Sequence, residues 1–130
     1  MKALMLCFAA GGLGALANSV AVWAFGHFGI NQSMGVAIAP ALTAAWLYPR
    51  IVWGGLWGFL FALPLSNSRP LTKAALLSLF PTAFQLFVVF PYFLGKGVAG
   101  IELGEMTPVL VLIFNWIWAL VTMMSLRLAR

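Results

Sequence analysis

Long apolar runs separated by short polar segments dominate the pattern of this chain. The four longest cover residues 3–26, 51–66, 74–95 and 107–126. Because a helix rises about 1.5 Å per residue, about 20 apolar residues are needed to cross the hydrocarbon core of a bilayer. The pattern therefore predicts four transmembrane helices, of which the second is short for a complete crossing.

Prolines and polar residues mark the ends and irregularities of these helices. The third run contains Pro81 and Pro91, and each removes a backbone N–H donor, so we expect kinks there. The fourth run begins with Thr107 and Pro108, in which the threonine hydroxyl would cap the helix and the proline would take its first position.

Residues 34–48 form a shorter apolar segment between the first two runs. It is interrupted by Pro40, is followed by Pro49, and is preceded by polar residues 31–33 that resemble a helix start. A segment of this length does not cross a bilayer, so we predict a re-entrant or interfacial helix. The alternative is one long, proline-bent second span that begins near Gly35.

Composition supports a membrane location for the whole chain. Hydrophobic residues make up 64% of the 130 positions and charged residues 7%. A soluble domain of this length could not bury so much apolar surface. We therefore expect one all-α membrane domain over residues 1–130, in the bilayer of a bacterial inner membrane, with no nucleic acid as a partner.

The basic residues predict which side of the membrane each loop occupies. The net charge is +5, and the four-span arrangement puts five basic residues on one side and two, together with both acidic residues, on the other. Cytoplasmic loops are enriched in lysine and arginine, so both termini are predicted inside. Arg50 and Arg69 would extend toward the two interfaces and lengthen the short second span. The predicted topology anchors are Lys2, Arg50, Arg69, Lys73, Arg127 and Arg130.

A cleaved signal peptide is an alternative reading of the first run. Residues 15–17 have the small–x–small pattern of a cleavage site, directly before Asn18. Apolar sequence resumes after Ser19 and continues through Phe25, however, which is typical of a continuous span. We therefore favour an uncleaved first helix.

Polar side chains inside the spans are the best functional candidates, since each costs free energy in hydrocarbon unless it has a partner. Counting residues from the helix ends places Asn18, Gln85 and Asn115 at one depth, roughly 10 to 15 Å below the outer surface. Two readings remain open. The amides hydrogen-bond one another, with about 0.6 to 2 kcal/mol each, or they line a solvated pocket. The predicted polar cluster comprises Asn18, Ser78, Thr82, Gln85, Asn115 and Thr122.

Small residues predict close helix packing. Gly11, Gly14 and Ala15 give the first span a flat face, and Gly54 with Gly58 forms a GxxxG pattern in the second. In lipid such faces allow helix backbones to approach closely. The contact could be internal to one chain, or it could join copies in a homo-oligomer or bind a partner membrane protein.

Signatures of chemistry are weak. His27 is the only histidine and lies near no nucleophile in the sequence, and no cofactor-binding loop is found, so we expect neither an enzyme nor a cofactor. His27, Glu102 and Glu105 are weak metal-ligand candidates, because their spacing matches no metal motif. Two functional hypotheses follow: an oligomeric channel or transporter-like protein for a small solute, or a non-transporting scaffold or accessory subunit of a membrane complex.

Overall fold

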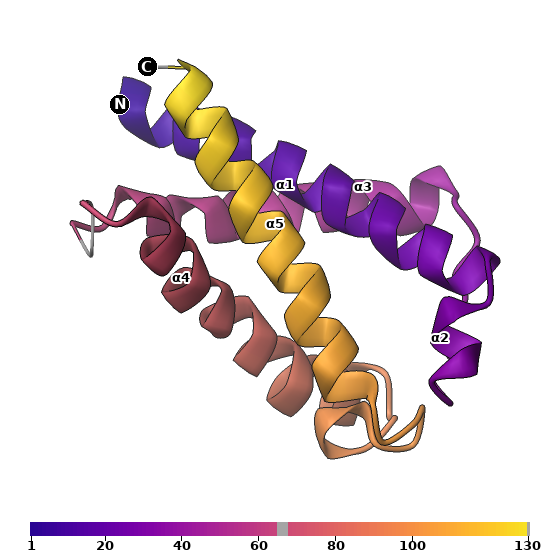
Figure 1. The fold of residues 1–130 in the computed structure, drawn as a ribbon. Helices are drawn as coiled ribbons and strands as arrows, with labels where there is room; N and C mark the ends of the chain where they lie inside the picture. The colour runs from indigo at the N-terminus through magenta and orange to yellow at the C-terminus, as the bar shows by residue number, and fades with distance from the viewer. Residues whose placement is uncertain (65–67, 130) are drawn as a thin grey trace.

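The computed structural model describes residues 1–64 and 68–129, and the regular secondary structure in them is helical, without strands (Figure 1). Three helical stretches in this part of the chain are long and apolar enough to cross a membrane: α1, α4 together with η2, and α5. The prediction of an all-helical chain is thus confirmed, the three long apolar helices are consistent with an integral membrane protein, and the fourth crossing stays a prediction. The elements are α1 (Lys2–His27), α2 (Ile30–Ser33), α3 (Ala44–Gly58), η1 (Phe59–Ala62), α4 (Pro70–Phe84), η2 (Gln85–Phe93), η3 (Val98–Gly100) and α5 (Thr107–Ala129).

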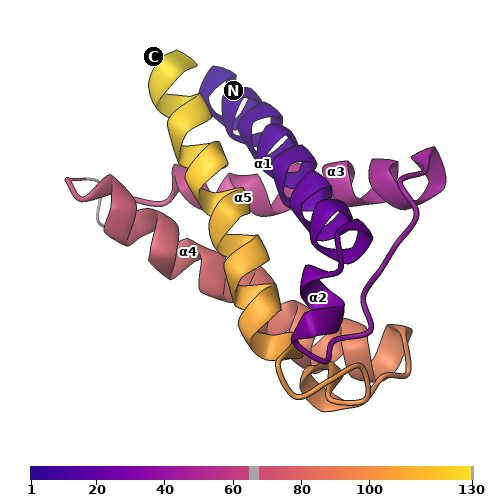
Figure 2. The same cartoon turned by 45° about the vertical axis from the view of Figure 1, so that its right-hand side comes forward.

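Helix α1 is the centre of the packing. It lies along both α3 and α5, and α4 packs against the other side of α5. The amino and carboxyl termini lie at the same end of the molecule, as both views show (Figures 1 and 2). Helix α1 passes through Ala17 and Asn18 without a break, so the residues on both sides of the apparent cleavage site belong to one helix.

The predicted helix at residues 34–48 is wrong. Residues 36–43 are not helical, and residues 44–48 are instead the first turns of α3, which continues through Pro49. The side chain of Thr43 caps this helix by accepting a hydrogen bond from the Trp46 N–H at 3.2 Å. The non-helical segment is held by a distant loop, because the Ala37 N–H donates to the Leu103 carbonyl at 2.9 Å. Helix α3 therefore begins before residue 51, the predicted start of the second apolar run, and the predicted end of that run at residues 65–66 lies outside the described residues.

The helical stretch formed by α4 and η2, which corresponds to the third predicted span, widens in its second half. It passes Pro81 as an α-helix and becomes a π-helix from Gln85 to Phe93, with Pro91 inside. A proline ring clashes with the carbonyl four residues earlier in an α-helix, so the wider turn accommodates Pro91. Segments of π-helix occur frequently at functional sites. Thr107 does not cap α5 as predicted, since its buried hydroxyl has no hydrogen-bond partner among the described residues.

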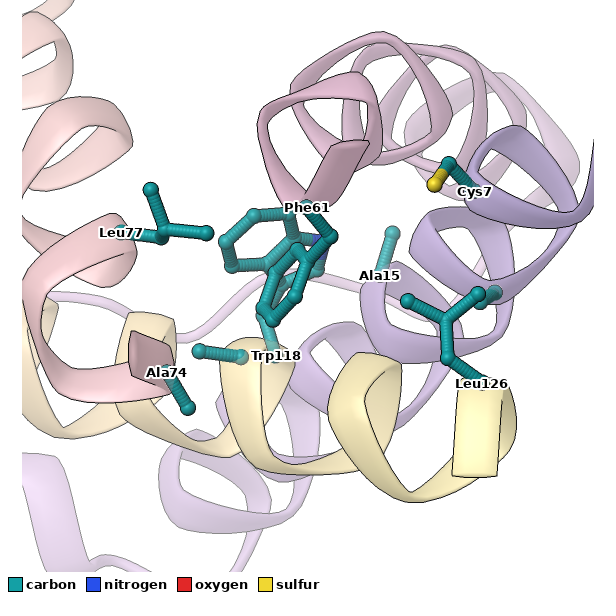
Figure 3. Packing of buried hydrophobic residues seen from close by; sticks show 9 residues of the cluster. Cys7, Ala15, Phe61, Ala74, Leu77, Trp118 and Leu126 are labelled. Atoms are coloured by element: carbon teal, nitrogen blue, oxygen red, sulfur yellow. The ribbon is translucent and has the colours of Figure 1, made fainter. Parts of the chain in front are cut away.

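An apolar core fills the half of the bundle nearer the termini (Figure 3). The rings of Phe61 and Trp118 meet edge to face at its centre, with centroids 5.8 Å apart. Leu77 of α4 packs against the same cluster, and Cys7 is buried in it. The indole N–H of Trp118 donates to the Gly11 carbonyl at 3.1 Å, which joins α5 to α1.

Small residues allow α1 and α3 to pack backbone to backbone. A Cβ atom added to Gly11 would collide with the Gly54 carbonyl oxygen and would lie 2.8 Å from the Gly58 Cα. One added to Gly54 would collide with Ala15. Gly14 serves the same purpose toward α5, since its added Cβ would lie 2.5 Å from the Trp118 carbonyl oxygen. All five predicted packing residues therefore contact other helices of the same chain.

A candidate solute-binding cavity around Arg50

The facing surfaces of α1 and α3 carry small residues at one end and polar residues at the other. On α3, Arg50, Gly54 and Gly58 follow at intervals of four and therefore share one helix face. This face packs on the α1 face that contains Gly11 and Ala15, and the next residue at that spacing is Ser19. Close backbone contact at the glycines thus places the Arg50 side chain directly against α1.

Arg50 points into the bundle rather than toward the outer interface. Its Nε donates to the Ser19 hydroxyl at 2.9 Å, and its Nη2 donates to the Asn18 side-chain oxygen at 2.7 Å. The guanidinium carbon also lies 4.7 Å from the centroid of the Trp46 ring, in cation–π geometry. The predicted role of Arg50 as an outer topology anchor is therefore corrected, because its charged group is turned inward.

Asn18 connects this arginine to α5. Its oxygen accepts from Arg50, and its amide nitrogen donates to the Phe114 carbonyl at 2.6 Å. Asn18 and Ser19 are both buried. One amide thus joins three helices, since its own residue lies on α1, Arg50 on α3 and Phe114 on α5.

The other two predicted amides form a direct pair. The Asn115 amide nitrogen donates to the Gln85 side-chain oxygen at 2.7 Å and to the Thr82 hydroxyl at 3.0 Å. Thr82 in turn donates to the Ser78 carbonyl of its own helix at 2.8 Å. The remaining two predicted polar residues lie apart from this pair, because Ser78 donates to the Ala75 carbonyl and Thr122 to the Trp118 carbonyl, within their own helices.

Both polar groups line one cavity of about 240 Å³. Its polar wall comes from four helical elements, and its apolar wall is largely aromatic. Figure 3 shows Trp118, one of these aromatic residues, within the apolar core. The polar lining residues are Asn18, Ser19, Arg50, Gln85 and Asn115, and the aromatic ones are Trp53, Trp57, Phe84, Phe93 and Trp118. The amides therefore both form hydrogen bonds and line a pocket, so the two readings of the sequence are compatible.

A second cavity of about 420 Å³ adjoins the first. Asn18, Arg50, Gln85 and Val89 line both of them. The second cavity extends to the exposed Lys96 and to the non-helical residues 37–40. Together the two spaces lead from the loops at one end of the bundle to the level of Arg50.

The basic residues at the opposite end surround a separate pocket. Lys2, Lys73 and Arg127 line a space of about 640 Å³ there. The Lys73 ammonium donates to the carbonyls of Phe61 and Leu63, at 3.0 and 2.9 Å. Arg69 is exposed directly before α4, and Arg130 lies outside the described residues. Four of the predicted anchors thus lie at the start of α1, the start of α4 and the end of α5: Lys2, Arg69, Lys73 and Arg127.

The weak metal-ligand candidates are not brought together. His27 stacks on Trp23, with ring centroids 5.1 Å apart, and its edge meets Phe28. Glu102 and Glu105 are exposed in the connection before α5. Within residues 1–64 and 68–129, no group of three histidine, cysteine or acidic side chains is placed to hold a metal ion.

Comparison with family models, with curated proteins and with solved structures gives no match to this chain. The inward orientation of Arg50 was not predicted, although the sequence contains a signal for it, because Arg50 lies four residues before Gly54 on the GxxxG face. That spacing predicts that its side chain is directed toward the packed neighbour.

Proposed function

We propose that this chain is a four-crossing, transporter-like membrane protein that binds a small polar solute in the cavity beside Arg50. The observation that carries the proposal is the polar lining contributed by α1, α3, α5 and the π-helix η2. Polar side chains are costly at membrane depth and mark solute pathways when they line a cavity. Binding sites built near the middle of the bilayer, from irregular helices, are typical of secondary transporters.

The fourth crossing is assigned to α3 together with η1. These elements extend from Ala44 to Ala62, and at about 1.5 Å per residue an α-helix of that length approaches the thickness of the hydrocarbon core. Termini at one end of the molecule (Figure 1) fit an even number of crossings. The excess of basic residues near that end favours a cytoplasmic location for both termini.

The proposed pathway is open at one end and closed at the other. The two cavities share four lining residues, and the inner one reaches Trp118. The Trp118 ring contacts Phe61 (Figure 3), which lines the pocket near the termini. A solute could therefore enter from the loop end and bind, and its release on the other side would require this aromatic contact to separate. Such a closed inner side is expected of a transporter that alternates between two open states.

The scaffold alternative and a homo-oligomer draw less support. Both were based on the small-residue faces as docking surfaces for a partner helix. Gly11, Gly14, Gly54 and Gly58 are instead in contact with helices of the same chain. A second copy or a partner subunit would need another surface.

Uptake of solutes into liposomes tests the proposed function. Osmotic swelling of proteoliposomes is measured with a panel of small solutes that differ in size and charge. Val89 lines both cavities, so Val89→Trp should fill the pathway and reduce uptake at least ten-fold. Val88→Trp is the matched control, because Val88 is adjacent to Val89 in the sequence but lines neither cavity.

Alanine at all three amides provides the second arm of this test. Asn18, Gln85 and Asn115 are replaced together, and Ser78→Ala with Thr122→Val serves as the control for loss of intramembrane hydroxyls. Uptake that persists in the triple amide variant and in Val89→Trp refutes a role for this cavity. Absence of uptake by the unmodified protein for every solute in the panel refutes transport itself.

A further inference from the structure

Arg50 carries a positive charge that no carboxylate of the described residues neutralises. An arginine side chain remains protonated in proteins. Its partners among the described residues are the neutral Asn18 and Ser19 side chains and the Trp46 ring. The chain has only two acidic side chains, Glu102 and Glu105, and both are exposed in the connection before α5.

The guanidinium also has unused hydrogen-bond donors that reach the cavities. It has five N–H groups, of which one at Nε and one at Nη2 are used toward Ser19 and Asn18. The other donors find no acceptor in residues 1–64 and 68–129. The Gln85 amide nitrogen likewise donates to no described group, although its oxygen accepts from Asn115. Both side chains line both cavities.

We infer that the solute of this cavity is a small organic anion whose carboxylate or phosphate group binds Arg50, with its apolar body among the aromatic side chains. This inference rests on the proposed function and names the charge of the solute. Arginine binds such oxyanions through two parallel N–H groups. An unpaired charge at membrane depth is costly, and a bound anion would neutralise it.

The shape of the cavity fits a small ligand with an apolar part. Its volume of about 240 Å³ is just below the usual range of ligand pockets, about 300 to 1,000 Å³. Trp53 and Trp57 of α3 contact Phe84 of α4 in its wall, with ring centroids 6.1 and 5.6 Å from that of Phe84. At the mouth of the adjoining cavity the exposed Lys96 would attract anions toward Arg50.

Two sources could supply this chemistry. A water-soluble carboxylate would enter past Lys96, through the larger cavity. An anionic lipid would enter from the bilayer beside Trp53 and Phe93, which line the inner cavity and are largely exposed. The charged group binds Arg50 in both cases, so the experiment has an arm for each source.

Calorimetric titration of the full chain in zwitterionic nanodiscs tests the inference. Benzoate is compared with the neutral benzamide and the cationic benzylamine, which share its ring. Benzoate should bind at least ten-fold more tightly than either. Arg50→Gln should lower benzoate affinity at least ten-fold, whereas Arg69→Gln, an exposed arginine outside both cavities, should not change it. For the lipid source, brominated phosphatidylglycerol should quench the cavity tryptophans more than brominated phosphatidylcholine.

A second variant keeps the test decisive if Arg50→Gln does not fold. Gln85→Glu retains an oxygen that can accept from Asn115 and places a carboxylate beside both cavities, where it would compete with the ligand for Arg50. Benzoate affinity should fall at least ten-fold. Gln32→Glu makes the same change of charge outside both cavities and should leave affinity unchanged.

The outcomes separate this inference from the proposed function. Equal binding of the three ring compounds would overturn the anion assignment while leaving a solute site in place. No binding by any of them, without a preference for the anionic lipid, would also overturn it, and the swelling assay then decides on transport. Benzoate binding that survives both Arg50→Gln and Gln85→Glu would show that the anion binds elsewhere.

Discussion

Replacement of Asn18 by leucine tests whether this amide holds Arg50 inside the bundle. Leucine has a similar size, so the main loss is two hydrogen bonds, one from the Arg50 guanidinium at 2.7 Å and one to the Phe114 carbonyl at 2.6 Å. A hydrogen bond to a charged group contributes about 1.5 to 3 kcal/mol, and one between helices in a membrane about 0.6 to 1.7 kcal/mol. Unfolding free energy should therefore fall by about 2 to 5 kcal/mol.

The assay is reversible unfolding in mixed micelles with increasing sodium dodecyl sulfate, followed by circular dichroism. Thr122→Val is the matched control, since its hydroxyl donates only to the Trp118 carbonyl of its own helix. A double-mutant cycle with Arg50→Gln isolates the pairwise contribution. Coupling near zero, or a loss no larger than that of Thr122→Val, would refute the argument that Asn18 holds the guanidinium.

Two further predictions concern packing and topology. Gly11→Ala should destabilise the protein by about 1 to 3 kcal/mol through overpacking against Gly54, whereas Gly12→Ala should be nearly neutral, because its Cβ would lie 3.5 Å from the Ile51 side chain. Equal effects in the same unfolding assay would contradict the close approach of α1 and α3. In a Cys7→Ala background, an impermeant maleimide should label Ala41→Cys on intact cells and Ser68→Cys only after lysis. Labelling of both positions from one side would exclude a crossing by α3.

The lengths of the apolar runs sufficed to predict α1 and α5 closely. Each run is long enough to form a spanning helix by itself, so local sequence decides its structure. The segment at residues 34–48 could not be predicted in this way. Its first half is held in a non-helical conformation by the Ala37–Leu103 hydrogen bond, a contact between residues far apart in the sequence.

The error at α3 also explains why Arg50 was misplaced. A helix that began at residue 51 would leave Arg50 at the interface, free to extend toward water. The helix begins at Ala44, so Arg50 lies in its second turn and faces α1. Counting residues nevertheless brought Asn18, Gln85 and Asn115 to one level, and all three line the same cavity. Which of them pair directly depends on helix rotation, which residue counting does not give.

The attachment of Arg50 to α1 has a consequence for how the chain enters the membrane during synthesis. An arginine raises the free energy of inserting a helix, by about 2.5 to 3.5 kcal/mol at the helix centre, and α3 with η1 is shorter than the three candidate spans. Its partners Asn18 and Ser19 lie on α1, which precedes α3 in the sequence and is therefore synthesised first. In the proposed four-crossing arrangement, α1 would thus supply the hydrogen-bond acceptors for Arg50 as α3 enters the bilayer.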